Sequence, residues 1–527
     1  MLSHITCLSG LPMNPHFKRD YPDDWRMPSR VYARLDHVEL PSASVSGKML
    51  LAFDSVDAQW LVDRARVDER FDLDKPDFAL VAQAARPLQA SGPGLGPSLF
   101  ETVPLYRIEV EHQLGLTLFD YGHPDFVDTG RQDSGLAALE DIWFILDLFL
   151  EGMGNASPAL VYPGLFAQPR SAFVTGTALQ GTMPSVQRGR ALSGIFSLAN
   201  LPVLATSSLQ HVLSVGVADL LAVYDVGQGN SNALLEEHLG RPAPRLYYDL
   251  GAGVYRNKHT TPAVLQFCFT NRPPIVLSHW DADHWAGAFA NSFGGTYPAL
   301  QQNWYAPMQK VGPVHVAFAH QLISSGGTMH TYTAVPGTIG ICGLATNRTL
   351  RFTLGSGTDR NNTGFVLAVE DNTLQPRRSW LLTGDCDYVY FMGHLNPNPP
   401  VGLVAPHHGA DLVGGMNAPA PVVLQNSYCR LMYSFGAGNK HGKKRHPTAK
   451  GMQLHAASGW HHGAWSPATP GDCVAGNDVL ATEMHGFGAG SGAQLGGCLI
   501  GWNQVPSPIS PPCAASAPSC TVSPIQS

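Results

Sequence analysis

Four potential metal ligands lie within six residues of one another in the segment Ser278 to Gly287, which reads SHWDADHWAG. They are His279, Asp281, Asp283 and His284. Imidazole nitrogens and carboxylate oxygens are the ligands that Zn²⁺ and Mn²⁺ take from proteins. Side chains at i, i+2 and i+4 leave an extended loop on the same side. The spacing therefore predicts a metal site, although a loop whose Asp283 only caps the next helix would read similarly.

Two later stretches add residues of the same kind at the ends of predicted strands. The apolar run 380–382 leads into Asp385, and the run 401–405 leads into His407 and His408. A single His or Asp at a strand end is usually ordinary loop chemistry. Three strands that end in His or Asp within a span of 135 residues are hard to attribute to chance. The three clusters are therefore expected to meet.

Hydrophobic periodicity predicts the elements that position these residues. A short buried strand at 275–277 precedes the first cluster, and a short helix is expected from Trp285 to Phe293. Further strands are predicted at 221–226, 245–250, 350–354, 364–369, 379–383, 401–405 and 430–434, and helices at 261–269, 313–323 and 448–456. Runs of strands with helices between them predict two mixed sheets with helices outside them.

The rest of the chain carries no such motif. Residues 1–217 contain 16 Lys and Arg against 24 Asp and Glu, which argues against that region gripping a phosphate backbone. An α+β region is predicted there, with strands at 48–53 and 106–110 and a buried helix at 136–150. Residues 218–502 are nearly balanced, with 17 basic against 16 acidic residues, so a local basic groove is allowed. The Pro- and Ser-rich tail, 503–527, is predicted to be disordered.

Composition bounds the class of protein. A hydrophobic content of 44% is typical of a globular chain, and 527 residues suffice for two or more domains. No run of about 18 uncharged apolar residues is present, so no membrane span is expected. The first residues show no basic segment followed by an apolar core, so no secretory signal is expected, and nine scattered cysteines fit reduced thiols better than a disulfide framework. We therefore expect a cytoplasmic protein without a membrane partner.

Six motifs in order resemble the metallo-β-lactamase fold, and most closely its ComEC/Rec2 branch of DNA-uptake proteins. They are DVGQGNS (225–231), YYDLG (247–251), SHWDADHWAG (278–287), LLTGD (381–385), APHHGA (405–410) and SFGAGN (434–439). The resemblance covers about residues 219–500, so a hydrolase domain is expected at 218–502, with a domain boundary after residue 217. It implies an αββα sandwich with one or two metal ions at one edge, a hydrolase activity and, for that branch, a metal-dependent nuclease.

The resemblance also distributes the metal ligands. It assigns His279 and Asp281 to a first metal, Asp283 and His284 to a second, Asp385 to both as a bridge, and His408 or its neighbour His407 to the second. The commoner pattern has a histidine where this chain has Asp281. Because a carboxylate is a hard, anionic ligand, we predict that the site accepts Mn²⁺ as well as Zn²⁺.

Supporting residues follow from the same resemblance. Asp225, at a strand end, is expected to orient ligands rather than to bind metal, and Gly227 and Gly229 are expected to shape the turn after it. The middle histidine of the superfamily has no counterpart in the stretch 359–364, DRNNTG, so the first metal is expected to bind weakly. Asn361 and Asn362 in that stretch are expected near the substrate.

The segment 440–447, KHGKKRHP, is the one basic stretch suited to a phosphodiester. Lys443, Lys444 and Arg445 are expected to contact substrate phosphates, and a solvated surface loop is the equally weighted alternative. The related branch has a short Gly-His-Pro here, to which either His441 or His446 corresponds. Asn439, just before the segment, is also expected at the substrate.

Three alternative functions are consistent with these expectations. The first is a phosphodiesterase or nuclease that uses a metal-activated water, with Asp283 taking the proton of the nucleophile, His446 assisting, and nucleic acid or another phosphodiester as substrate. The second is hydrolysis of a small ester, lactone or amide, because the fold does not fix the substrate. The third is a regulatory protein that binds metal without turnover. The partner of residues 1–217 is left open.

Overall fold

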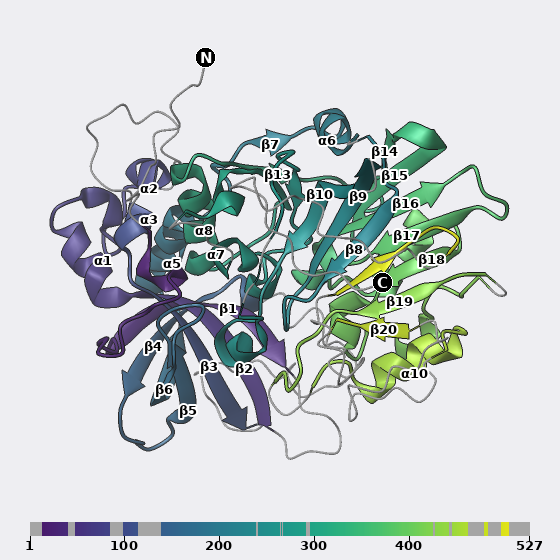
Figure 1. Cartoon of the computed structure of the whole chain (residues 1–527). Helices are drawn as coiled ribbons and strands as arrows, with labels where there is room; N and C mark the ends of the chain where they lie inside the picture. Colours follow the sequence, from purple (N-terminus) through teal and green to yellow (C-terminus); the bar gives the residue numbers. More distant parts are fainter. Residues whose placement is uncertain are drawn as a thin grey trace.

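The computed structural model describes most of the chain. The described residues are 13–39, 48–84, 99–113, 139–214, 216–238, 241–263, 265, 267–290, 296–424, 427–441, 445–461, 479–482 and 497–504. Their strands form a closed six-stranded barrel and two open sheets of eight and seven strands. Figure 1 shows the barrel strands in purple and blue on one side of the molecule, and the two sheets in teal and green on the other.

The barrel is built from the first third of the chain, and all its strand pairs are antiparallel. Its strands, in spatial order, are β1 (Arg30–Glu39), β2 (Lys48–Asp57), β3 (Leu105–Gln113), β5 (Ser157–Tyr162), β6 (Arg170–Ala178) and β4 (Trp143–Phe149). Val31, Phe53, Ile108 and Leu146 are buried in one cluster inside it. In the described part of this region, the helices α1 (Ala58–Ala65), α2 (Phe78–Ala84), α3 (Leu99–Thr102) and α5 (Met183–Ile195) lie between or just after the barrel strands along the chain.

One prediction for this region is wrong and two are confirmed. The strands expected at 48–53 and 106–110 lie within β2 and β3. The helix expected at 136–150 is not formed at its second half, where β4 occupies 143–149. The apolar run WFILDLF satisfies the strand alternation because Asp147 points outward and pairs with Arg30 at 2.6 Å. Pairing with β1 on one side and β6 on the other decides the conformation.

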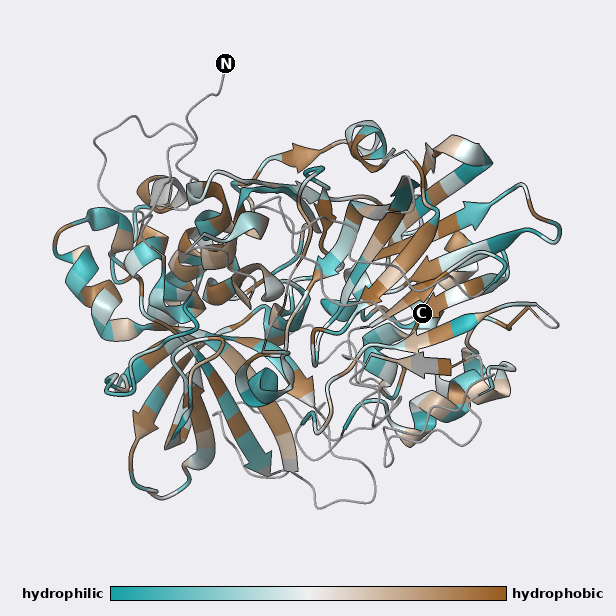
Figure 2. Cartoon of the chain, in the orientation of Figure 1, coloured by the Kyte–Doolittle hydropathy of each residue, from teal (hydrophilic) through white to brown (hydrophobic). Residues whose placement is uncertain are grey.

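The eight-stranded sheet carries the first two motifs and the metal loop. Its order is β21 (Gly497–Ile500), β8 (Leu220–Tyr224), β9 (Ser231–His238), β10 (Arg241–Leu250), β11 (Ile275–Val276), β12 (Asn303–Pro307), β13 (Thr328–Tyr332) and β7 (Val203–Leu204). The helices α7 (Gly287–Ala290) and α8 (Pro313–Ser324) pack with this sheet in one core. Figure 2 shows α8 as mostly hydrophobic, in keeping with its burial.

The seven-stranded sheet faces the first across a shared core. Its order is β14 (Gly340–Gly343), β15 (Arg348–Leu354), β16 (Phe365–Asp371), β17 (Arg378–Leu382), β18 (Pro400–Val404), β19 (Arg430–Tyr433) and β20 (Val479–Ala481). Leu221 and Tyr248 from the first sheet meet Phe352, Leu367 and Trp380 from the second. The helices α9 (Met392–Leu395) and α10 (Ala449–Ala457) lie with the opposite face of the second sheet.

Most strands and two helices of this half are confirmed, and two other helices are not. The strands and the helices at 313–323 and 448–456 agree with the structure to within a few residues. The helix expected at 261–269 is wrong: the described part is irregular, and the hydroxyl of Tyr247 both donates to the carbonyl and accepts from the N–H of Cys268. The helix expected at 285–293 reduces to α7, and residues 291–295 lie outside the described part.

The cysteines differ in part from expectation. Cys342, Cys386, Cys429 and Cys498 are buried free thiols, as expected. Cys268 is disulfide-bonded, so the expectation of reduced thiols is wrong at that position. None of the helices in the described ranges is long and apolar enough to cross a bilayer.

Contacts cross the predicted domain boundary at residue 217. β7, from the first half, pairs in parallel with β13 of the second. The 3₁₀ turn Pro15–Phe17 brings Phe17 onto Phe289, with ring centroids 4.6 Å apart. The helix α6 (Thr206–Leu213) buries Leu209 and Leu213 in the core between the two sheets. A fragment that begins at Ala218 would lack all of these contacts.

Candidate metal centre

The loop after β11 carries the first ligand cluster into the interior. β11 lies between β10 and β12 in parallel pairing, so its end is fixed on both sides. The 3₁₀ turn Ala282–His284 follows, closed by a hydrogen bond from the N–H of His284 to the carbonyl of Asp281. His279 and His284 are fully buried there, with ring centroids 4.1 Å apart. Two imidazoles that cannot reach water need a partner.

The three predicted clusters meet at this loop. Ligand atoms of His279, His284 and Asp385 lie within 4.8 Å of one another, and so do those of Asp283, His284 and His408. His284 Nε2 is 3.2 Å from Asp385 Oδ1, and His408 Nε2 is 3.4 Å from Asp283 Oδ2. The two triads share His284, which places five predicted ligands around one small volume.

The facing atoms in this volume have no hydrogen-bond partner among the described residues. They are the Nε2 atoms of His279, His284 and His408 and the Oδ1 atom of Asp385, all buried. A buried polar atom without a partner costs about 1–3 kcal/mol, so four of them in one place call for a ligand that satisfies them together. Imidazole nitrogens and a carboxylate oxygen are a fitting donor set for a divalent transition metal. The residues present therefore fit the implied metal.

A second set of contacts orients the histidines. His284 Nδ1 lies 2.8 Å from Asp249 Oδ2, and His408 Nδ1 lies 2.7 Å from the carbonyl oxygen of Ser434. In each ring the Nδ1–H donates to that acceptor, so Nε2 faces the other ligands and offers its lone pair to a metal once its own proton is released. Asp249 also accepts from the N–H and hydroxyl of Ser278 at 2.6 and 2.8 Å and from Asn230 Nδ2 at 3.0 Å.

Sequence reasoning missed Asp249 and assigned its role to Asp225. Asp225 accepts from the N–H of Gly227 at 3.1 Å, so it closes the turn rather than orients a ligand histidine. Burial raises the pKa of Asp225 to about 6. The residue that orients a ligand histidine is therefore Asp249, and not Asp225 as was expected from the sequence. The signal for Asp249 was the motif YYDLG, whose aspartate stands at the end of β10 beside the metal-loop strand.

The glycines after Asp225 allow this turn to pack on the metal loop. Gly227 has φ +76°, a conformation that other residues resist. A Cβ added at Gly229 would lie 2.4 Å from the carbonyl oxygen of Asp283. The turn between β8 and β9 therefore lies against the backbone of the metal loop, as the expected supporting role requires.

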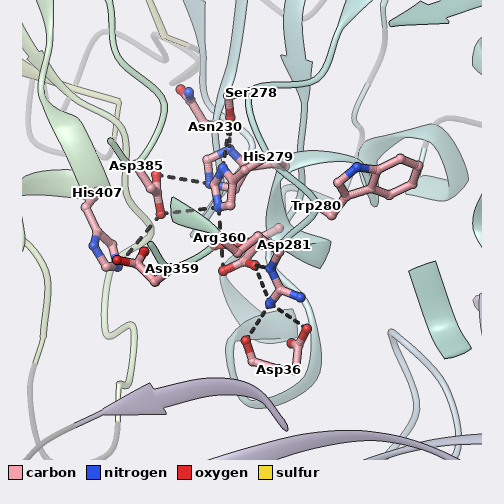
Figure 3. A network of polar contacts seen from close by, with 12 residues as sticks. Asp36, Asn230, Ser278, His279, Trp280, Asp281, Asp359, Arg360, Asp385 and His407 are labelled. Atoms are coloured by element: carbon pink, nitrogen blue, oxygen red, sulfur yellow. Dashed lines mark hydrogen bonds and ion pairs between the residues drawn. The ribbon is translucent and has the colours of Figure 1, made fainter. Parts of the chain in front are cut away.

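Asp281 lies beside the two triads in a different set of contacts. Its Oδ1 accepts from Arg360 Nε at 2.7 Å, and its Oδ2 is 3.5 Å from His279 Nε2. Arg360 is nearly buried and also pairs with Asp36 of the barrel at 2.5 Å. Figure 3 shows Arg360 between the carboxylates of Asp281 and Asp36. Burial opposes ionisation of Asp281, but Arg360 and then His279 outweigh it and hold its pKa well below the usual range.

The charged groups of the centre shift one another's pKa values. Burial opposes ionisation of Asp385, but His284, His408 and His407 outweigh it and hold its pKa well below the usual range. Burial would lower the pKa of His284, whereas Asp385 and Asp249 raise it well above 6.5 in the metal-free protein. A proton on His284 and a metal ion compete for the same nitrogen, so metal binding must release protons.

Of the two neighbouring histidines His407 and His408, His408 is the one that lies nearer the interior of the centre. His407 Nε2 is 3.8 Å from Asp385 Oδ2, and its side chain is 20% exposed, against 2% for His408. His446 is buried and stacks on His441 with ring centroids 3.9 Å apart. Burial, together with the neighbouring histidines, holds the pKa of His446 well below 6.5. Both His441 and His446 thus lie beside the centre, and His441 lines the cavity next to it.

The predicted substrate residues are placed unevenly. Asn362 bonds Asp359 and the N–H of Asp387, and Asn439 bonds the backbone of His446 at both of its ends, so these amides stabilise loops. Asn361 lies in a 3₁₀ turn outside the cavity lining. Arg445 is exposed, and Lys443 and Lys444 lie outside the described residues.

An open cavity adjoins the centre, with about 700 Å³ of free space including its solvent-filled mouth. One wall comes from the metal-bearing half and includes Asp281, Asp283, Asp385, His407 and His408. Other lining residues come from the barrel strands β1 to β3, namely Asp36, His37, Leu50, Ala52, Arg107 and Glu109. The barrel was not expected to contribute to the site, and nothing in its sequence carries a motif that would have shown it.

Comparisons with known proteins add no assignment. No family model matches the chain, and neither a curated protein nor a solved structure matches it. The likeness to the metallo-β-lactamase fold therefore remains a prediction from the six motifs.

Proposed function

We propose that the chain is a metal-dependent hydrolase of the metallo-β-lactamase fold that acts on phosphodiesters. The observation that supports it most is the set of four ligand atoms, on His279, His284, His408 and Asp385, that have no hydrogen-bond partner among the described residues and face one another in a buried volume beside an open cavity. A centre kept only for structure would have no need of an adjoining cavity.

The roles of the residues follow from their positions. His284, His408 and Asp385 would hold one ion with Asp283, and His279 with Asp385 would hold a second, to which Asp281 can add its Oδ2. A bound Zn²⁺ or Mn²⁺ would lower the pKa of a coordinated water toward 7 and polarise the scissile bond. Asp283 lines the cavity with a partly exposed carboxylate, so it can accept the proton of the attacking water.

The lining of the cavity supports an anionic substrate. Arg107, Arg256 and Lys440 lie in it, together with His407 and His441. Arg256 is paired with Glu109 at 2.8 Å, and Arg107 is paired with Asp36. Lys440 has no ion pair within the part of the chain that the structure describes, so its ammonium group is free to meet a substrate phosphate.

The second candidate is hydrolysis of a small ester, lactone or amide. The barrel residues in the lining favour it, because a cleft lined by two parts of the fold suits a small molecule or a chain end better than a long duplex. Apolar Leu50, Ala52 and Val254 in the lining would serve a neutral substrate as well.

The proposal is tested by measuring the metal content of the purified protein and its activity on a panel of substrates. The purified full chain is loaded with Zn²⁺ or Mn²⁺ and assayed on bis(p-nitrophenyl) phosphate, single- and double-stranded oligonucleotides, a lactone and a β-lactam. Metal-dependent cleavage of the phosphodiesters supports the proposal. Turnover of the lactone or β-lactam alone would move the assignment to the second candidate, and absence of bound metal would remove both.

A further inference from the structure

The turn between β8 and β9 presents one side chain that the metal centre does not use. Gln228 is 0% exposed, and both its Oε1 and its Nε2 lack a hydrogen-bond partner among the described residues. The residue lines the cavity, while its own backbone N–H is taken by the hydroxyl of Thr260 at 2.8 Å. A buried amide with neither group satisfied costs the protein stability, roughly 1–3 kcal/mol per group.

The barrel places an unpartnered hydrogen-bond donor in the lining of the same cavity. Arg107, on β3 of the barrel, is nearly buried and lines the same cavity. Its Nη1 pairs with Asp36 and lies 3.4 Å from Asp54, whereas its Nε is buried without a hydrogen-bond partner among the described residues. Its guanidinium lies 5.2 Å over the ring of Tyr255, which fixes its plane.

The two residues belong to different parts of the fold but to one neighbourhood. Tyr255 begins the 3₁₀ turn Tyr255–Thr260, and Thr260 at its other end holds the backbone of Gln228. The turn that carries Gln228 packs on the metal loop, since a Cβ at Gly229 would meet the carbonyl oxygen of Asp283. An amide and a guanidinium N–H that lack partners among the described residues therefore both line the cavity next to the candidate metal centre.

We propose that Gln228 and Arg107 form a substrate-recognition subsite, shared by the barrel and the metal-bearing half, for a phosphate ester that carries a hydroxyl group. This inference rests on the proposed phosphodiesterase function. Arg107 Nε and Gln228 Nε2 donate to anionic oxygens of the ester. Gln228 Oε1 is an acceptor, so it needs a donor on the substrate, and a hydroxyl near the phosphate supplies one. A sugar phosphate or a nucleotide offers both groups together.

The subsite also gives the barrel a function. Its strands β1 to β3 supply Arg107 and the apolar Leu50 and Ala52 to the cavity. The metal loop then cleaves the ester, while the barrel selects which ester enters. A glutamine kept unsatisfied in the free protein at a cost to stability is what a residue reserved for a ligand would show.

The test uses two chromogenic phosphodiesters and the metal-loaded full chain. The p-nitrophenyl ester of thymidine 5′-phosphate carries a hydroxyl on its sugar, and bis(p-nitrophenyl) phosphate carries none. Gln228→Leu removes the amide at similar volume, and Gln228→Met is the second variant in case leucine packs badly. Gln321→Leu is the matched control, because Gln321 is also a buried glutamine but accepts from the N–H of Asn14 at 3.0 Å.

The inference predicts opposite effects on stability and selectivity. Gln228→Leu should keep the metal content, should unfold at an equal or higher temperature than the wild type, and should lower the preference in kcat/KM for the hydroxyl-bearing ester by roughly 10-fold. The Gln321→Leu control should unfold at a lower temperature with its preference unchanged. An unchanged preference in both Gln228 variants, or a lower unfolding temperature in both, would overturn the subsite.

A binding measurement keeps the subsite separate from the hydrolase. If the wild type cleaves neither ester, the proposed function fails, and thermal protection of the metal-loaded protein by glycerol 1-phosphate and by inorganic phosphate decides the subsite. Greater protection by glycerol 1-phosphate that Gln228→Leu abolishes would uphold it. Equal protection by the two compounds would overturn it.

Discussion

Replacing Asp249 by asparagine perturbs the orientation of the candidate metal ligands without touching a ligand. Asp249 is fully buried and accepts from His284, Asn230 and both polar groups of Ser278. Asparagine keeps the shape and tolerates the left-handed φ of +61° at this position. It also replaces one acceptor oxygen by an NH₂ group. In either orientation of the amide, this NH₂ group therefore faces a group that donates to Asp249 in the wild type, on His284 or on Ser278.

The structure sets the size of the effect. If the NH₂ group faces His284, the ring must accept at Nδ1 and carry its proton on Nε2, which removes the lone pair meant for the metal. If it faces Ser278, the charge-assisted bond to its N–H is lost, at roughly 1.5–3 kcal/mol of unfolding free energy. Loss of such an orienting partner typically weakens metal affinity about 10–100-fold, or roughly 1.4–2.7 kcal/mol.

The assay is a competition titration with a chromophoric zinc chelator, followed by thermal unfolding with and without metal. Asp225→Asn is the matched control, because Asp225 is also a buried carboxylate at a strand end of the same sheet, but among the described residues its side chain accepts only from the N–H of Gly227. We expect the Asp249 variant to lose affinity 10–100-fold and the control to change less than about 3-fold. Wild-type affinity in the Asp249 variant, or an equal loss in both, would refute the reasoning.

Three further predictions concern other parts of the chain. Asp283→Ala should lose at least one metal ion and all hydrolase activity, measured by elemental analysis and turnover, because water cannot replace an anionic ligand at equal affinity; an unchanged metal content would contradict the ligand assignment. Burial lowers the pKa of His16 from 6.5 to about 4, so between these pH values the unfolded chain binds a proton that the folded chain does not. The free energy of unfolding, measured by denaturant titration, should therefore fall as pH falls through that window, by roughly 3 kcal/mol in total, and His16→Gln should remove this part of the fall; an identical pH profile in the variant would argue against it. Changing Lys443, Lys444 and Arg445 together to Ala should leave the metal content intact and reduce the slope of log affinity against log salt for oligonucleotides by up to about 2–3, whereas an unchanged slope and turnover would return this loop to a solvated surface.

The ligand clusters could be predicted from the sequence because each follows an apolar strand. A strand that ends in charged or imidazole side chains delivers them to a sheet edge, and the strands at 275–276, 378–382 and 400–404 all do so. The choice between His407 and His408 needed coordinates, because both side chains leave adjacent residues with left-handed φ. No periodicity rule tells which of two such rings turns inward.

The barrel and its contacts could not be predicted in the same way. The run at 143–149 is apolar enough to fit either a buried helix or a strand, and only its neighbours β1 and β6 decide between them. The contact from Arg360 to Asp36 joins residues 324 positions apart, and no local pattern marks either of them. The role of Asp249 was hidden for a related reason, since a single aspartate at a strand end is common in loops.

The most direct test of the metal centre is an X-ray structure of crystals of the full chain grown with Zn²⁺, with anomalous data collected on both sides of the zinc edge. We predict at least one anomalous peak bonded to His284 Nε2, His408 Nε2 and a carboxylate oxygen of Asp385, at about 2.0–2.2 Å. A second, weaker peak is expected at His279. Crystals in which these atoms stay free of zinc, or hold it only at surface histidines, would contradict the account.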